Sequence, residues 1–372
     1  MRGAATGITQ PFSSTAREGR RPRPWMLAIA ASASGLGLIA GCGSVPSSAA
    51  SASQLNPAAA AAPAVAPAAC ASGTCWVAVS AATLWVKPGT ARPVDQPALS
   101  NPAHPGTWVK VMTLAQKQWL VGRLETQALY GSKVTVIGHW KNWTHVTVPS
   151  QPTNRDTRGY PGWVPTVQLT STPPPAGATY VVVRSAAAWV RSSWTPAGVT
   201  GKKILLVAYD SRFTLVRATA SYVEVALIGG QHAALPRSDV VVHTTGTSWG
   251  ITRAKVVAEA KKFLGLAYLW AGTSGFGYDC SGFTYSAYHA SGLTLSRDAD
   301  QQAVHGTPVA RDALQPGDLV FFRGSASGPI THVGMYVGGG NMIDAPNTNA
   351  VIRIEPVSGF GIYAGARRYL SG

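Results

Sequence analysis

The sequence has 372 residues, enough for several domains that each bury a core of their own. Charged residues make up only 12% of it and hydrophobic residues 46%, a figure inflated by alanine-rich segments, and the formal net charge is +16. No basic stripe interleaved with aromatic residues and no nucleic-acid-binding motif accompanies this charge, so we expect no nucleic-acid partner. A generally basic exported protein, working among anionic lipid or acidic wall polymers, fits better.

The amino terminus, residues 1–41, has the pattern of a secretion signal. Several arginines precede the apolar run at residues 25–42, whose apolar core is shorter than the roughly 20 residues that a membrane-spanning helix needs. The run ends in Ile-Ala-Gly-Cys, which resembles the lipobox of bacterial lipoproteins, and that resemblance implies that Cys42 is lipidated and becomes the first mature residue. We therefore expect export and a lipid anchor at the outer face of the bacterial cell membrane. The alternative is an ordinary cleaved signal with a chance cysteine.

Residues 42–72 are nearly all alanine, proline and serine, a composition that buries no core and predicts a flexible tether. Cys70 and Cys75 follow in an exported and therefore oxidising setting, so a small disulfide ring is favoured. A metal knuckle is the alternative, but no second Cys/His pair at metal-ligand spacing accompanies it, and we expect no metal. Cys280 is then left as a lone thiol.

Two similar stretches indicate an internal repeat. "WVAVSAATLWVKPG" from Trp76 and "YVVVRSAAAWVRSS" from Tyr180 each begin with an aromatic residue, alternate apolar and polar residues, and reach a tryptophan nine residues later. Short alternating strands punctuated by Gly, Pro and Asn follow each copy. The pattern resembles a pair of bacterial SH3-like barrels at residues 73–172 and 177–245. The first copy has about 32 additional residues, which predict a binding loop.

The last part of the chain, residues 250–372, predicts a separate α+β domain. Residues 253–264 have helical spacing, and a second helix is predicted to start at Cys280 and to end near Gly292. A helix amino terminus favours a thiolate and presents backbone N–H groups to a developing oxyanion. Cys280 is therefore a candidate nucleophile, and the alternative is a cysteine packed in the core.

A nucleophilic thiol needs a base, and a candidate hairpin supplies one. His332 begins an alternating segment that predicts a strand, a run of glycines reverses the chain, and Asp344 lies on the returning strand. Across such a hairpin the two side chains can share one face. Asp344 could then orient the imidazole of His332, as the third member of a triad does.

Three motifs in this order, "YLWAGTSGFGYDCSGF", "QPGDLVFF" and "HVGMYVGGGNMIDAP", resemble the NlpC/p60 family of papain-like cell-wall cysteine peptidases. The resemblance implies that two all-β SH3-like barrels precede an α+β papain-like peptidase domain that cleaves peptidoglycan stem peptides between γ-D-glutamate and a diamino acid. It makes Cys280 the nucleophile and His332 the general base. It places Asp344 at the third triad position, where many members have histidine, and Tyr268 near the oxyanion.

Members of this family with two such barrels act on stem peptides that have a free amino-terminal L-alanine. The resemblance implies that Glu125 and Tyr160, from the first barrel, bind the amine, with Asp279 sharing the ammonium and Ser281 contacting the peptide. A buried ammonium needs carboxylates around it, which agrees with this assignment. Ala299 departs from the pattern, because the subgroup often has serine there. Glu125 and Tyr160 have an alternative as ordinary barrel residues.

The sequence thus predicts a monomeric cysteine endopeptidase that needs no cofactor and acts on stem peptides and muropeptides. Asp298 follows an arginine just before Ala299, and we expect it to be a surface or helix-capping residue. Two other functions remain open: a wall-binding lipoprotein whose papain-like domain is idle, and a papain-like amidase or acyltransferase.

Overall fold

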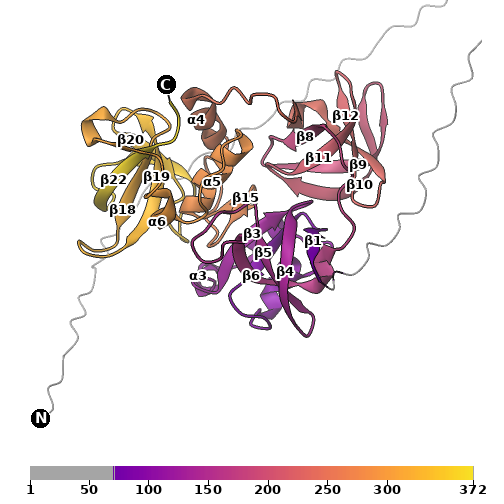
Figure 1. Cartoon of the computed structure of the whole chain (residues 1–372), viewed down its shortest axis with the longest axis horizontal. Helices are drawn as coiled ribbons and strands as arrows, with labels where there is room; N and C mark the ends of the chain where they lie inside the picture. Colours follow the sequence, from indigo (N-terminus) through magenta and orange to yellow (C-terminus); the bar gives the residue numbers. More distant parts are fainter. Residues whose placement is uncertain (1–69, 71, 372) are drawn as a thin grey trace, which may run out of the picture. The chain divides into compact units, whose positions relative to one another are not determined.

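The structure, a computed structural model, describes residue 70 and residues 72–371 (Figure 1). The predicted signal, the lipidation site at Cys42 and nearly all of the predicted tether lie outside the described residues. Cys70 and Cys75 form a disulfide with their Cα atoms 6.0 Å apart, and Cys280 is a free cysteine. Within the described part of the chain, no helix has the length and apolar character that crossing a bilayer requires.

The first part of the described chain is a seven-stranded antiparallel sheet with the order β3-β2-β6-β5-β4-β1-β7. Its apolar residues alternate with polar ones and bury a core that includes Val77, Leu84 and Val146. The disulfide packs against the same core. The strands are β1 (Thr74–Val77), β2 (Ala81–Trp85), β3 (Leu124–Leu129), β4 (Lys133–Trp140), β5 (Trp143–Val148), β6 (Tyr160–Pro165) and β7 (Leu169–Thr170).

The second part repeats this topology. Its order, β10-β9-β13-β12-β11-β8-β14, is the order of the first sheet with each strand replaced by its counterpart seven positions later. The internal repeat predicted from two short stretches of sequence therefore extends to the whole arrangement of strands. These strands are β8 (Thr179–Val183), β9 (Ala187–Thr195), β10 (Gly198–Ala208), β11 (Arg212–Ala218), β12 (Tyr222–Ala226), β13 (His232–Pro236) and β14 (Val240–Thr244).

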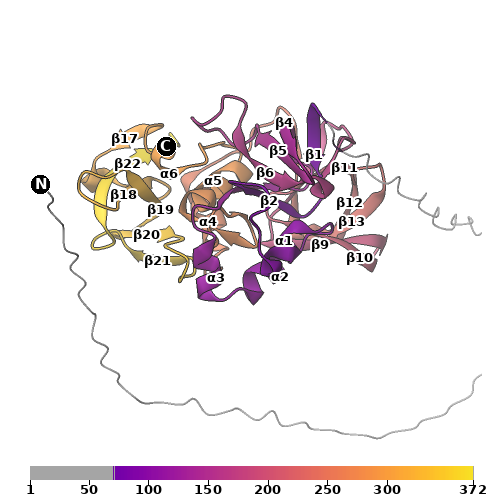
Figure 2. The same cartoon turned by 90° about the horizontal axis from the view of Figure 1, so that it is seen from below.

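The additional residues of the first copy form short helices rather than an open loop: α1 (Gln96–Leu99), α2 (Pro105–Val111) and α3 (Leu114–Trp119), labelled in Figure 2. Trp108 of α2 is fully buried, and its indole Nε1 donates to Asp95 at 2.9 Å. Asp95 also pairs with Arg92 at 2.8 Å, so this buried carboxylate is neutralised. The helices share an apolar cluster with Leu269 and Ala271 of the last part of the chain.

The last part of the chain is α+β, as predicted. Its six-stranded antiparallel sheet has the order β17-β22-β18-β19-β20-β21, and α5 packs against β19 (Figure 1). The helices are α4 (Arg253–Lys261), α5 (Cys280–Ala290) and α6 (Ala299–Gln302). The strands are β15 (Thr273–Ser274), β16 (Gly277–Tyr278), β17 (Thr307–Val309), β18 (Leu319–Arg323), β19 (Ile330–Gly338), β20 (Asn341–Asp344), β21 (Arg353–Pro356) and β22 (Ile362–Arg368).

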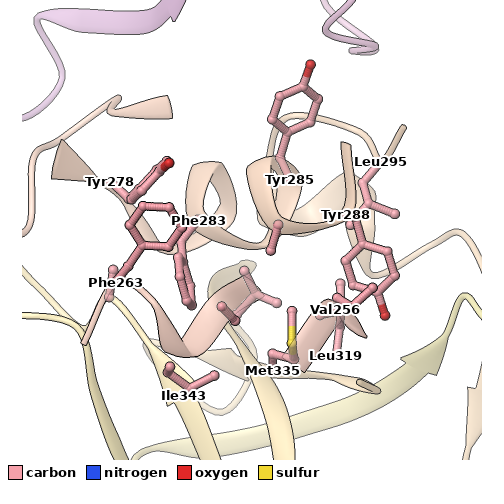
Figure 3. Close-up of a cluster of buried hydrophobic side chains, with 14 of the residues drawn as sticks. Val256, Phe263, Tyr278, Phe283, Tyr285, Tyr288, Leu295, Leu319, Met335 and Ile343 are labelled. Atoms are coloured by element: carbon pink, nitrogen blue, oxygen red, sulfur yellow. The ribbon is translucent and has the colours of Figure 1, made fainter. Parts of the chain in front are cut away.

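One apolar core joins the helix that begins at Cys280 to the sheet that contains His332. Phe283 and Tyr288 of α5 are buried together with Met335 and Ile343 of the sheet (Figure 3). Burying a side chain of this size contributes about 1.5–3 kcal/mol. Because helix and sheet are held by the same packed core, the position of Cys280 relative to the histidine strand is fixed.

Candidate active site

Cys280 is the first residue of α5, where the sequence predicted a helix start. Asp279 is the N-cap, with φ −88° and ψ 179°, and its Oδ1 accepts the Gly282 N–H at 2.6 Å. The half-buried thiol therefore lies beside the positive end of the helix, which favours an anionic sulfur. Gly282 is required here because a Cβ at this position would lie 2.1 Å from the carbonyl oxygen of Gly272.

His332 and Asp344 lie close together across the predicted hairpin of β19 and β20. The imidazole Nε2 and the carboxylate Oδ2 are 2.7 Å apart. His332 is 8% exposed and Asp344 is fully buried, and the ring of Phe360 lies 4.5 Å from the imidazole. Burial and this single short contact hold the imidazole in one orientation, with the side chain of Asp344 behind it.

The ionisation of this pair suits acid–base chemistry. Burial alone would lower the pKa of His332, but hydrogen bonds to Asp344 and Cys280, together with their negative charges, raise it to about 9. Burial raises the pKa of Asp344 to about 6, although His332 acts in the opposite direction. Between these two values the site contains an imidazolium and a carboxylate, and the imidazolium stabilises a thiolate at Cys280.

Tyr268 lines the same cavity as Cys280. Burial raises the pKa of Tyr268 well above its usual value, and the nearby charges of Cys280 and Asp279 act in the same direction. Its hydroxyl therefore keeps its proton at neutral pH and remains a hydrogen-bond donor. A donor next to the thiol can stabilise a negative oxygen that forms there.

Asp279 and Ser281 lie on either side of the thiol and share one partner, Arg297, which the sequence analysis did not single out. The guanidinium of Arg297 is 1% exposed and donates to both oxygens of Asp279, at 2.7 and 3.1 Å, and to the Ser281 hydroxyl at 3.0 Å. Its Nε also donates to Thr126 of β3 at 3.0 Å. The carboxylate of Asp279, expected to share a substrate ammonium, is thus already paired with a buried cation.

The same cavity is also lined by the residues expected to bind an amine. The Tyr160 hydroxyl donates to the two oxygens of Asp298 at 3.1 and 3.0 Å. Glu125 lies on β3 with a side chain that is 10% exposed. Asp298, expected to be a surface or helix-capping residue, does occupy the N-cap position of α6, but its side chain makes no capping bond, and its half-buried carboxylate accepts from Tyr160 instead. Burial raises the pKa of Asp298.

A cavity of about 630 Å³ connects these groups. Asp344 does not line it, because it lies behind the imidazole. Ala299, the departure from the family pattern, is part of the lining. The other predicted site residues that line the cavity are Glu125, Tyr160, Tyr268, Asp279, Cys280, Ser281 and His332. Among the described residues, no group of three His, Cys, Asp or Glu side chains is arranged to hold a metal ion.

Comparison with known proteins agrees with this geometry. Residues 265–368 match the NlpC/P60 family. Two relatives are γ-D-glutamyl-L-lysine dipeptidyl-peptidases. The one from Bacillus cereus is 41% identical, over 79% of this chain and 90% of its own length, and the one from Bacillus subtilis is 36% identical, over 75% and 92%.

The crystal structure of an NlpC/P60 family protein from Bacillus cereus is similar over 80% of this chain and all of its own, with a TM-score of 0.74 and 39% identity. The similarity therefore includes the β-rich region as well as the last part of the chain. A helix that starts at Cys280 and packs on a sheet that contains His332 is consistent with a papain-like domain. The chain belongs to the NlpC/P60 family.

Proposed function

We propose that the protein is a cysteine endopeptidase that cleaves the γ-D-glutamyl–diamino acid bond of peptidoglycan stem peptides. The observation that carries this proposal is the His332–Asp344 pair, hydrogen-bonded beside the thiol of Cys280 in one cavity. Two relatives that this chain covers almost completely are γ-D-glutamyl-L-lysine dipeptidyl-peptidases, which supports the choice of bond.

The mechanism is acyl transfer through the thiol. The Cys280 thiolate attacks the γ-glutamyl carbonyl, and the backbone N–H at the start of α5, with the Tyr268 hydroxyl, stabilises the oxyanion. The imidazolium of His332 then gives its proton to the leaving amine of the diamino acid, which leaves a thioester. Neutral His332 takes a proton from water, the resulting hydroxide opens the thioester, and Cys280 is released.

The carboxylates that line the cavity account for a substrate with a free amino-terminal L-alanine. Asp298, which accepts from the Tyr160 hydroxyl, supplies one carboxylate for the ammonium. Glu125 lines the same cavity and supplies the second; its partner Arg155 is 41% exposed, unlike the buried Arg297 that pairs with Asp279. We assign to Asp298 the role that the sequence suggested for Asp279, because Arg297 already neutralises Asp279. An ammonium bound at a fixed distance from Cys280 would limit cleavage to the bond after the second residue.

We further propose that the two seven-stranded sheets are SH3-like barrels and that Cys42 is the site of a lipid anchor. The identical strand orders of the two sheets support a duplicated small barrel. The arginines, the short apolar run and the Ile-Ala-Gly-Cys sequence support the anchor. Such a protein would act on stem peptides in the cell-wall space, tethered to the outer face of the membrane.

The test is digestion of L-Ala-γ-D-Glu-L-Lys and its diaminopimelate counterpart, followed by mass spectrometry. We expect the dipeptide L-Ala-D-Glu as product, with no cleavage by Cys280→Ala at an unchanged melting temperature, and slow cleavage of the N-acetylated peptide. Wall binding without cleavage of any muropeptide by the unmutated protein would instead support a binding protein. Product masses from cleavage at another amide would support an amidase.

A further inference from the structure

Arg155 is the only lysine or arginine among the described residues that line the cavity. Four carboxylates line it as well, those of Glu125, Asp279, Asp298 and Asp300. The other group there that can carry positive charge is His332, and it is already engaged by Asp344 and Cys280. Asp279 is already paired with the buried Arg297 and Glu125 with Arg155, so Arg155 is the group of this lining that an anionic part of a substrate could approach.

Contacts with Glu125 and Tyr160 fix the side chain of Arg155 but do not occupy all of its N–H donors. Its guanidinium pairs with both oxygens of Glu125, one of them at 2.8 Å, and its Nη1 donates to the Tyr160 hydroxyl at 3.1 Å. These contacts take three of the five N–H donors of a guanidinium. The side chain of Arg155 is 41% exposed, whereas that of Glu125 is 10% exposed. Arg155 thus lines the cavity in a fixed position with two N–H donors left for a ligand.

The loop that contains Arg155 is fixed to the catalytic part of the chain. The backbone N–H of Asn154 donates to Gln301 at 2.8 Å, and the Gln301 amide donates back to the Asn154 side chain at 3.0 Å. Shortly before α6 begins, the backbone N–H of Arg297 donates to the carbonyl of Pro152 at 2.9 Å. The backbone of Arg155 is therefore fixed relative to Cys280, as a residue that recognises a substrate requires.

The proposed substrate contains a charge that no residue discussed above would neutralise. A glutamyl residue linked through its γ-carboxyl keeps a free α-carboxylate, which lies between the L-alanyl ammonium and the bond that is cleaved. We propose that Arg155 binds this α-carboxylate, so that the site selects γ-D-glutamyl residues with a free acid over residues with an α-carboxamide. The inference rests on the proposed function and deepens it: the Glu125–Arg155 pair would match a substrate end that has one positive and one negative charge.

Two peptides that differ at a single group test this proposal. Values of kcat/KM are measured for L-Ala-γ-D-Glu-L-Lys and for L-Ala-D-isoglutaminyl-L-Lys, in which an amide replaces the α-carboxylate. We expect the unmutated protein to prefer the acid by about 10- to 100-fold, the range for a charge-assisted hydrogen bond. Arg155→Gln should bring the ratio close to one by slowing cleavage of the acid, and Arg155→Lys should retain part of the preference.

The ratio of kcat/KM for the acid to kcat/KM for the amide is the decisive readout. Any effect of the substitution on Glu125, and so on binding of the ammonium, changes kcat/KM for both peptides by the same factor. Arg158→Gln is the matched control: Arg158 lies on the same loop and pairs with Asp156, but it does not line the cavity, so the ratio should not change. A protein that cleaves both peptides equally well overturns this inference and leaves the proposed function intact. The inference also fails if Arg155→Gln speeds or slows both peptides to the same extent. Cleavage of neither peptide would overturn the proposed function and the inference together.

Discussion

The hydroxyl of Tyr160, on β6 of the first sheet, donates to both carboxylate oxygens of Asp298, at 3.1 and 3.0 Å. These residues are 138 positions apart in the sequence, and their contact joins the first sheet to the catalytic part of the chain at the wall of the cavity. The hydroxyl of Tyr160, from the first sheet, thereby orients the carboxylate of Asp298, from the last part of the chain. The amine subsite that we propose therefore needs both parts to be folded together.

Replacing Tyr160 with phenylalanine removes this bond and keeps the ring. A hydrogen bond to a charged group contributes about 1.5–3 kcal/mol, so KM for a peptide with a free amino-terminal L-alanine should rise by about tenfold or more. The value of kcat should change by less than about threefold, because the thiol and imidazole are untouched. Steady-state kinetics measure both. Tyr222→Phe, in the second sheet, is the control and should change neither, and an unchanged KM in Tyr160→Phe would remove Tyr160 from the amine site.

The dependence of kcat/KM on pH should be bell-shaped, with apparent limbs near pH 6 and pH 9. As the pH falls through about 6, Asp344 gains a proton and no longer holds the imidazolium. As the pH rises through about 9, His332 loses the proton that the leaving amine needs. A pH profile of initial rates tests this prediction, and a rate that still climbs above pH 9 would contradict it.

Asp344→Asn should move the high-pH limb of this profile downward. Both the hydrogen bond and the charge of Asp344 raise the pKa of His332, and the substitution removes the charge while it keeps a polar side chain. Activity at neutral pH should fall by about 10- to 100-fold, since papain-like enzymes tolerate asparagine as the orienting residue. Asp344→Ala should be the more damaging change. Equal profiles for Asp344→Asn and the unmutated protein would show that Asp344 does not orient the imidazole.

Arg297→Met should destabilise the fold strongly. The substitution leaves the carboxylate of Asp279 in a largely buried place without its cation, and breaking a buried pair in this way costs about 3–5 kcal/mol. Urea unfolding followed by fluorescence measures the loss. Arg353→Met is the matched control, because Arg353 pairs with Glu355 on the surface with 48% of its side chain exposed, and such a pair contributes about 0–1 kcal/mol. Similar losses in the two variants would argue against a structural role for Arg297.

Gly282→Ala should lower catalysis more than its small size suggests. The new Cβ would meet the carbonyl oxygen of Gly272 at 2.1 Å, so the start of α5 and the thiol must shift. Overpacking of this kind costs about 1–3 kcal/mol, and a shift of the nucleophile should reduce kcat by about tenfold or more. Gly138→Ala is the control, because its Cβ would make only an ordinary contact at 3.6 Å. Normal kcat in Gly282→Ala would show that the helix start tolerates displacement.

Short stretches of sequence were enough to predict the elements on which Cys280 and His332 lie. The segment after Cys280, which ends near Gly292, predicted the helix start, and alternation around a glycine run predicted the hairpin of His332 and Asp344. Both predictions are confirmed, because they depend on residues close together in the chain. The internal repeat was visible for the same reason, since each copy has its own alternating strands.

Long-range partners could not be read from the sequence in this way. The pairing of Arg297 with Asp279 and the contact of Asp298 with Tyr160 depend on how the first sheet meets the catalytic part of the chain. The only local signal was an arginine and an aspartate side by side before Ala299, a pattern that also occurs on ordinary surfaces. The insertion was expected to be a loop because its helices are too short to give a clear period.

Helix α5, which begins at Cys280, makes contacts with all three parts of the chain. Tyr285 donates to Ser150 of the first part at 2.9 Å, His289 bonds to Asp210 of the second, and Phe283 is buried in the core of the last. If residues 250–372 alone were joined to another protein, the polar groups of Tyr285 and His289 would lose these hydrogen-bond partners. Exchange of this catalytic part in engineering therefore requires matching changes in its neighbours, so that the hydroxyl of Tyr285 and the imidazole of His289 keep polar partners.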